Sequence, residues 1–211
     1  MRRQLLTATR SVLVMLVVFG LVFPLLITAI ARIAFPHQAG GSLIEARGRA
    51  IGSELIGQSF TSPGYFHPRP SAAGSGYDAA SSGGTNLGPT SDKLVHGVHQ
   101  KLPNGKDDPG NFEGVADLAA AYRRENGLAP NALVPADAVT RSGSGLDPDI
   151  SPANAYAQVA RVAKARHLPE DQLRGLVAAQ VTGRQLGFLG EPRVNVLQLN
   201  LALDGKGTVR R

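Results

Sequence analysis

The 211-residue chain contains no cysteine and no tryptophan, and aromatic residues make up only 5% of it. The lack of cysteine excludes disulfides and thiolate metal sites, although it does not identify a cellular compartment. Two common catalytic sequences are also missing, the GxSxG of many hydrolases and the HExxH of zinc proteases. The sequence therefore contains no motif that predicts a reaction.

Excess charge is also scarce beyond the N-terminal region. The formal net charge is +6, but four of the 22 Lys and Arg residues precede residue 34. The remaining 18 are opposed by all 16 Asp and Glu residues, which leaves a body of charge +2. A nearly neutral body lacks the basic surface by which proteins bind nucleic acids. We expect no nucleic-acid partner.

One long apolar run is present, from Val12 to Ala31, and its twenty residues include no charge. As a helix it would span the ~30 Å hydrocarbon core of a bilayer, where Pro24 is tolerated. One alternative is a signal peptide cleaved after Ala31, but the apolar part of such peptides is only about 7–15 residues long. Another is a buried core helix, which rarely stays apolar on every face. The run predicts a retained transmembrane helix.

The flanking charges predict how this helix is oriented. Arg2, Arg3 and Arg10 precede the run, whereas Arg32 alone follows it closely. Basic residues remain preferentially on the cytoplasmic side. We therefore expect a cytoplasmic segment 1–11, a transmembrane helix 12–31, a tether 32–41 and an extracytoplasmic domain 42–211.

The segment 42–211 is long enough for one domain, for which we expect a mixed, α+β fold. Glycines interrupt short apolar runs between Ser42 and Phe60, a pattern typical of short strands joined by turns. Ala116–Tyr122 is expected to form a short amphipathic helix that ends before Gly127.

Two consecutive helices are predicted further along the chain. Ser151-Pro152 has the form of an N-cap followed by proline at the first helical position, and basic residues near His167 suit a C-terminus. Pro169 and the acids after it open a second helix. A DNA-reading helix-turn-helix has the same order of elements, but the near-neutral charge favours an αα-hairpin packed on a sheet.

Two shorter patterns leave alternatives open. Leucines at every second position from Leu197 to Leu203 predict a half-buried strand, although Leu and Ala also favour helix. His96 and His99 are spaced to share one helix face and could bind a metal, but without a complete ligand set a solvated pair is favoured.

The segment Tyr65–Ser91 is rich in Gly, Ser and Pro and contains no low-complexity repeat. It lacks the GxxxxGK[ST] of phosphate-binding loops, and Thr85 follows Ser82-Gly83-Gly84 where a transport-ATPase LSGGQ signature would have Gln. We expect an ordered, turn-rich surface rather than a nucleotide site. Gly83 and Gly84 should permit backbone geometry closed to larger residues, and the Asn86 side chain should hold the turn.

The order of residues in this segment resembles the KdpC family, the C subunits of bacterial Kdp-type potassium-transporting ATPases. The resemblance extends over nearly the whole chain, with two departures. The family commonly reads His-Thr-Glu where this chain has Gln180-Val181-Thr182, and the segment 96–114 is longer than in compact members. The matching blocks include Arg69-Pro70-Ser71-Ala72, Gly74, Tyr77, Ser82–Gly88, Ser144-Gly145-Leu146-Asp147 and Gly190–Leu197.

The resemblance implies a non-catalytic accessory subunit of an ATP-driven, high-affinity potassium import complex in the bacterial plasma membrane. Its partners would be a channel-like A subunit, a P-type ATPase B subunit and a small F peptide, besides membrane lipid. It also implies a catalytic chaperone that raises the ATP affinity of the B subunit. No motif in this chain binds a cofactor, so the complex would handle ATP and potassium. The alternative is an exported soluble enzyme or binding protein released after Ala31.

Candidate interface residues come from two places, the apolar helix and the signature segment. In lipid, helices associate through close packing, so small residues mark contact faces, and a proline can bend the helix to follow its partner. The candidates are Gly20, Pro24, Thr28, Arg69, Ser71, Gly83, Gly84 and Asn86.

Overall fold

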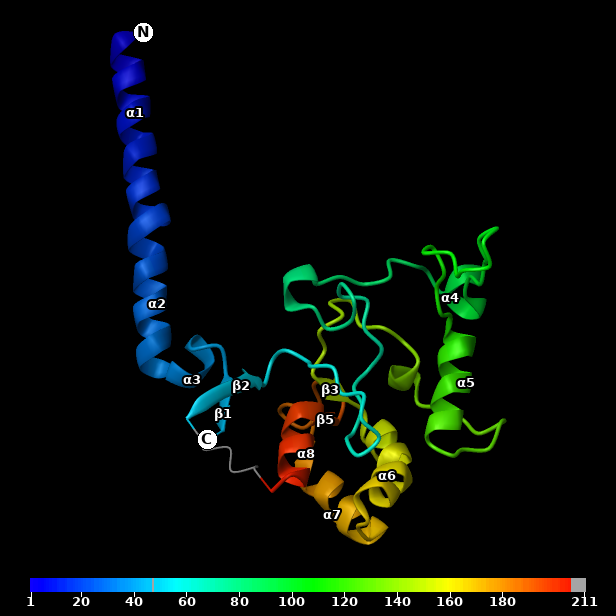
Figure 1. Ribbon diagram of the computed structural model, residues 1–211. Helices are drawn as coiled ribbons and strands as arrows, with labels where there is room; N and C mark the ends of the chain where they lie inside the picture. The colour runs from blue at the N-terminus through cyan, green and yellow to red at the C-terminus, as the bar shows by residue number, and fades with distance from the viewer. Residues whose placement is uncertain (47, 206–211) are drawn as a thin grey trace. The chain divides into compact units, whose positions relative to one another are not determined.

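The computed structural model describes residues 1–46 and 48–205. The chain divides into two compact units, Met1–Ile44 and Glu45–Arg211. The first is almost wholly helical, and the second mixes short strands with helices (Figure 1). The predicted α+β class, with one N-terminal apolar helix followed by a mixed domain, is confirmed.

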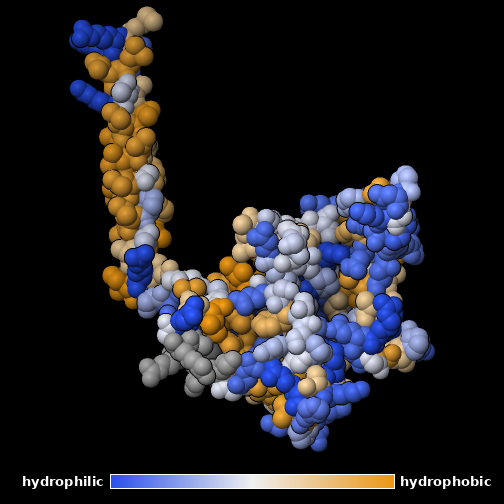
Figure 2. Space-filling view, viewed as in Figure 1, coloured by the Kyte–Doolittle hydropathy of each residue, from blue (hydrophilic) through white to orange (hydrophobic). Residues whose placement is uncertain are grey.

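The N-terminal unit is one long helical run built from three elements, α1 (Arg2–Val17), the π-helical η1 (Val18–Val22) and α2 (Phe23–Ala34), followed by the short α3 (Pro36–Ala39). The 33 residues Arg2–Ala34 are long and apolar enough to cross a membrane. Figure 2 shows a hydrophobic surface along most of this run, with hydrophilic side chains at its start. The predicted span 12–31 lies inside it, and the boundaries 12–31 and 32–41 stay predictions.

The π-helical turn is explained by Pro24. Proline has no N–H, so it cannot close the usual bond to the carbonyl four residues earlier, and its ring crowds that carbonyl. Here the chain widens just before the proline, where the Phe23 N–H donates to the Val18 carbonyl. The Thr28 hydroxyl then donates to the Pro24 carbonyl at 2.7 Å. The proline thus changes the helix geometry in the middle of the apolar run.

The larger hydrophobic core of the second unit lies between three helices and a small antiparallel sheet. The helices are α6 (Pro152–Arg166), α7 (Glu170–Gln180) and α8 (Val196–Leu203). The strands β3 (Asp149–Ile150), β5 (Arg193–Asn195) and β4 (Val181–Thr182) form the sheet in that order, and Val194 in β5 is opposite both Ile150 and Val181. The core includes Phe66, Val159, Val162, Leu173, Val177, Val194 and Leu199.

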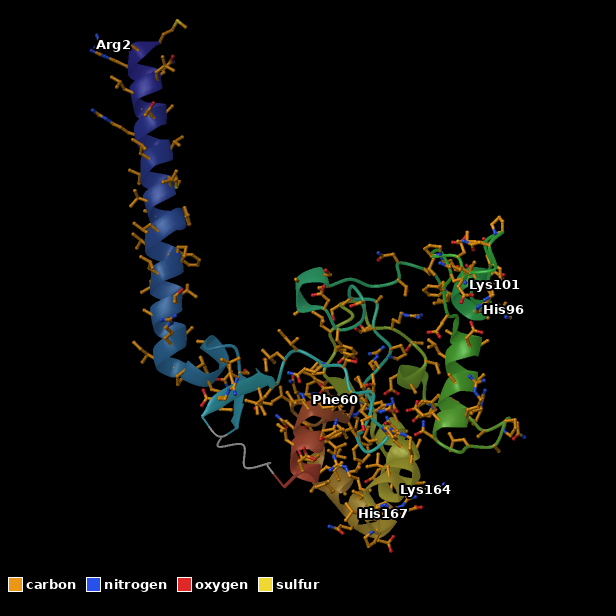
Figure 3. The ribbon with its side chains drawn as sticks, viewed as in Figure 1. Arg2, Phe60, His96, Lys101, Lys164 and His167 are labelled. Carbon is orange, nitrogen blue, oxygen red and sulfur yellow. The ribbon has the colours of Figure 1, made fainter. Side chains whose placement is uncertain are left out.

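The two consecutive helices form where the sequence predicts them. The Ser151 hydroxyl accepts the Asn154 N–H at 3.1 Å, so Ser151 caps α6 as expected. The helix ends at His167, whose φ of 54° is left-handed, and Pro169 precedes α7. Lys164 and His167 lie near this turn in Figure 3. The hairpin packing of the two helices stays a prediction.

The leucines from Leu197 to Leu203 form helix α8, so the strand prediction is wrong. The Asn195 side chain accepts the Gln198 N–H at 3.1 Å and caps the helix where β5 ends. The consecutive residues Leu199 and Asn200 are both buried, whereas a half-buried strand exposes every second side chain. High helix propensity and a cap therefore outweigh the period-2 pattern.

The remaining elements are short. The predicted strands near the start of the domain are β1 (Leu43–Ala46) and β2 (Arg49–Ser53), which form a two-stranded sheet. Helix α5 (Val115–Glu125) contains the predicted helical segment and precedes Gly127, whose φ is +65°. It builds a second cluster around Tyr122, Ala138 and Val139. The other short helices are η2 (Ala79–Ser81), α4 (Asp92–His96) and η3 (Ala136–Ala138).

The expected shared helix face of His96 and His99 is wrong, because α4 ends at His96 and Gly97 turns the chain with a φ of +82°. His96 lies 3.8 Å from Asp92, whereas His99 lies 3.0 Å from Asp117. Among the described residues, no group of three or more His, Cys, Asp or Glu could hold a metal ion. The longer segment 96–114 folds back on itself and is held by isolated antiparallel β-bridges such as Val98–Phe112. His96 and Lys101 in this segment are labelled in Figure 3.

The chain at Phe66 and His67 crosses the core outside any strand, and two side-chain amides satisfy its backbone. The Asn200 amide accepts the Phe66 N–H and donates to the Phe66 carbonyl, both at 2.9 Å. The Gln158 amide accepts the His67 N–H at 2.7 Å and donates to the His67 carbonyl at 3.0 Å. Asn200 and Gln158 are 2% and 1% exposed. We call these two residues the amide clamps, since they replace the hydrogen bonds of a neighbouring strand.

Replacing Asn200 by leucine should destabilise the domain by roughly 2–5 kcal/mol, because it leaves the buried N–H and carbonyl of Phe66 without partners. Chemical unfolding of the full chain in detergent, followed by circular dichroism, measures this. Gln198→Leu on the same helix is the control and should cost less than about 0.5 kcal/mol. An Asn200→Leu variant as stable as the original chain would contradict the clamp.

Candidate functional site

The signature segment Tyr65–Ser91 packs against a second segment, residues 140–147, and the two form one surface that we call the signature platform. Ser71 is central to it. Its hydroxyl donates to the Gly145 carbonyl at 2.6 Å and accepts the N–H groups of Ala73 and Tyr77 at 3.1 and 2.9 Å. Ser71 thus bonds backbone groups both in its own loop and in the second segment.

Arg69 joins the two segments through its side chain. Its guanidinium donates to the Asp147 carboxylate at 2.6 Å and to the Thr140 carbonyl at 3.3 Å. The Tyr77 hydroxyl donates to the Arg69 carbonyl at 2.8 Å. Burial and the nearby Asp147 charge raise the pKa of Tyr77 well above its usual range, so this phenol stays a neutral donor. Arg69 therefore holds the two segments of the platform together through bonds inside the domain.

Gly84 and Gly83 differ in their surroundings. A Cβ on Gly84 would lie 2.9 Å from the Gly143 carbonyl oxygen, so only glycine allows the two backbones to approach this closely. A Cβ on Gly83 would lie 4.0 Å from its nearest neighbour, and its φ is not positive. The predicted conformational need is therefore confirmed for Gly84 and wrong for Gly83. Gly83 contributes through its N–H, which donates to the Ser144 carbonyl at 2.9 Å.

Asn86 differs from its neighbours in its backbone conformation. Its φ of 52° is left-handed, a conformation that asparagine adopts more readily than most residues. We find no hydrogen bond from its side-chain amide to the described part of the chain. The expected side-chain bond is thus wrong, and Asn86 lies in the irregular segment 82–88 rather than in a turn.

Several residues of the platform were not among the candidates chosen from the sequence, chiefly Thr140, Gly145 and Asp147. Gly145 has a φ of +68°, and a Cβ there would lie 2.7 Å from the Ala73 nitrogen. The available signal was the block Ser144–Asp147, which belongs to the family resemblance. Its pairing with residues some seventy positions earlier requires the tertiary structure.

Below the platform, helix α6 carries a row of polar side chains at Asn154, Gln158 and Arg161. The Asn154 amide oxygen accepts from the Tyr122 hydroxyl at 2.8 Å and from the Gln158 amide at 2.9 Å. Arg161 donates to the carbonyls of Pro63 and Tyr65 at 2.7 and 2.9 Å. Within residues 1–46 and 48–205, every buried side-chain nitrogen or oxygen has a hydrogen-bond partner. This network aligns the chain that leads into the platform.

An ion pair joins this network to helix α5. The Nδ1 atom of His67 lies 2.6 Å from the Glu125 carboxylate, and Arg161 lies 3.7 Å from it. The hydrogen bond with His67 is the main cause that holds the pKa of Glu125 below its usual range. Burial opposes this shift, while the proximity of His67 and Arg161 adds to it. Burial lowers the pKa of Arg161, partly offset by the Glu125 charge.

A cleft of about 350 Å³ opens between the platform and α5, lined by residues that include Arg69, Tyr77, Glu125 and Arg141. The Arg141 guanidinium stacks over the Phe112 ring at 4.5 Å and donates to the Glu113 carbonyl at 3.0 Å. Burial lowers the pKa of Arg141. The guanidinium groups of Arg69 and Arg141, which line the cleft, are both bonded within the domain.

The structure does not test the candidates in the apolar helix as contacts. Gly20 lies inside the π-helical turn, and a Cβ there would meet nothing within 4 Å. The Thr28 hydroxyl donates its hydrogen bond to the carbonyl of Pro24 within the same helix. The departure at Gln180-Val181-Thr182 falls at the end of α7 and in strand β4, where Val181 is opposite Val194.

Replacing Glu125 by glutamine should lower stability at neutral pH and leave it little changed in acid. The folded-state pKa of Glu125 is depressed, so its contribution is present above the unfolded-state pKa and is lost as the pH falls through the lower folded value. The stability curves of the two proteins should therefore converge below about pH 4.3. Urea unfolding between pH 3 and 7 measures this, with exposed Glu170→Gln as the control. A difference independent of pH would contradict the ion pair.

Comparisons with known proteins agree with the resemblance. Residues 5–205 match the family model described as KdpC, the c chain of K⁺-transporting ATPase. A Koribacter versatilis protein named Potassium-transporting ATPase KdpC subunit is 53% identical over 205 residues, covering 97% of this chain and 96% of its own. Its namesake in Mycobacterium tuberculosis is 51% identical over 204 residues, covering 97% and 99%. The Caulobacter vibrioides namesake is 53% identical over 191 residues, covering 90% and 87%. The chain therefore belongs to the KdpC family.

Proposed function

We propose that this chain is a non-catalytic accessory subunit of an ATP-driven potassium import complex and that it stabilises the assembly. The observation that carries the proposal is the match to KdpC subunits along almost the entire chain. The platform supports it, because the polar side chains of Arg69 and Ser71 are bonded internally. A single apolar helix cannot enclose a conduction path, so transport and ATP hydrolysis would reside in other subunits.

The partners would be a channel-like A subunit, a P-type ATPase B subunit and a small F peptide in the bacterial plasma membrane. The basic residues Arg2, Arg3 and Arg10 support a cytoplasmic N-terminus, and residues 42–211 would then be extracytoplasmic. Gly20, Pro24 and Thr28 would contact partner helices in the bilayer, and the platform would contact an external surface of the complex.

We further propose that the chain raises the ATP affinity of the B subunit indirectly. ATP is cytoplasmic and the domain would be external, so the effect must pass through membrane-embedded partners. Such a coupling between sites is typically worth about 1–3 kcal/mol, or roughly 5- to 150-fold in affinity. The chaperone role of the family is then compatible with a chain that has no nucleotide-binding motif.

The Gly84→Ala substitution tests the platform as an assembly element. Its Cβ would collide with the Gly143 backbone and cost about 1–3 kcal/mol of local packing. Affinity purification of the tagged full chain from membranes should recover larger membrane subunits, and Gly84→Ala should lower that recovery several-fold.

Gly83→Ala is the matched control, because space for its Cβ is available. Complexes that still form with Gly84→Ala should hydrolyse ATP with a KM close to the original. If the unmodified chain is released from membranes without any larger subunit, the accessory role is wrong. An unchanged recovery with a raised KM would instead place the platform in nucleotide coupling.

Replacing Val12–Ala31 with a poly-leucine span of equal length tests the helix as a contact. The variant should insert normally, yet the intact complex should be lost, because a uniform surface lacks the small residues and the proline-linked turn. Growth at limiting potassium and co-purification report the result. Full potassium transport by this variant would mean that the external domain alone carries the association.

A further inference from the structure

The loop between β4 and β5 presents an unusual concentration of exposed apolar side chains. Leu186, Phe188 and Leu189 are 83%, 68% and 48% exposed, and together with Leu55, Ile56, Val95 and Leu133 they are the large apolar residues exposed in the described part of the second unit, up to residue 205. Three of these seven thus fall within four consecutive residues. We call residues 184–191 the apolar tip.

The tip is held in one shape by its own backbone. Gln185 and Leu189 exchange two hydrogen bonds, both at 2.9 Å, and the Phe188 N–H donates to the Gln185 carbonyl at 3.2 Å. Leu186 and Gly187 have φ values of +52° and +82°, as in a type I′ turn. Asparagine and glycine suit both positions of that turn, whereas leucine rarely adopts a left-handed conformation.

The tip also stands clear of the domain that carries it. A Cβ on Gly183, Gly187 or Gly190 would meet nothing within 4 Å. Its base is anchored nonetheless, since Thr182 pairs with Arg193 across the sheet and Val194 in β5 is fully buried. An apolar group that is rigid, exposed and mounted on the core sheet loses little conformational entropy when a partner covers it.

The chemistry of the tip favours a protein partner. Arg184 donates to the Glu191 carboxylate at 2.6 Å, so these neighbouring charges neutralise each other. Segments that settle into lipid headgroups are rich in Lys and Arg beside their apolar residues, whereas residues 184–191 contain one basic residue, Arg184, which is paired with Glu191. Aromatic anchors in apolar pockets are typical of the strongest contacts between proteins.

We propose that the apolar tip inserts into an uncharged, apolar pocket on a larger membrane subunit of the same complex. Phe188 would be the anchor, with Leu186 and Leu189 covering its edges. The proposal rests on the accessory role proposed above and adds a specific contact to it.

Two substitutions and one control test the contact in the full chain within membranes. Leu186→Asn removes the apolar side chain while supplying a residue that prefers the left-handed turn, so it should leave domain stability unchanged. Phe188→Ser removes the anchor. Each should lower recovery of the complex by about tenfold or more. Leu133→Asn alters a leucine that is 96% exposed in another loop, and its recovery should equal that of the original chain.

A photoreactive phenylalanine at position 188, in the assembled complex, identifies the occupant. We expect a crosslink to a larger membrane subunit and none from position 133. Crosslinks only to lipid or to a second copy of this chain would overturn the proposal, as would full recovery with Leu186→Asn and Phe188→Ser. That last result would leave the accessory role intact, whereas failure of the unmodified chain to recover any subunit would overturn both.

Discussion

A backbone that crosses the interior without a strand partner must still satisfy its N–H and carbonyl groups, and here Asn200 and Gln158 do so for Phe66 and His67. The amide clamps fix the first residues of the signature segment where the chain leaves the core. Arg69 and Ser71 follow within a few residues, so their reach to Asp147 and Gly145 depends on where the clamps hold the chain.

Helix α6 links these features because one of its faces is polar and still buried. Asn154, Gln158 and Arg161 connect α5, the clamped segment and the carbonyls that precede it. In a low-dielectric interior such a network is favourable only when every group is paired, which is the case for the described residues. The polar row thus replaces part of the apolar packing that a helix normally provides, and in return it specifies one path for a long irregular segment.

Helix caps, turns and the apolar run were predictable from the sequence, because each depends on neighbours a few residues away. Ser151-Pro152 and Pro169 predict the starts of α6 and α7, and the run around Pro24 predicts the long N-terminal helix. The order of residues in the signature segment was enough for the family resemblance. The sequence shows two glycines but not why only Gly84 must be glycine. The difference lies in the distance from a Cβ at each position to the Gly143 backbone, which only the structure gives.

Local order thus determined the starts of α6 and α7, the apolar helix and the family of this protein. The tertiary structure decided which distant groups meet: Arg69 with Asp147, Asn200 with Phe66, and His99 with Asp117 rather than on the face of α4. It also decided that the alternating leucines after Asn195 wind into α8, because a cap and two-sided burial act there together. Such contacts join residues far apart in the chain, and no periodicity or spacing in the sequence encodes that separation.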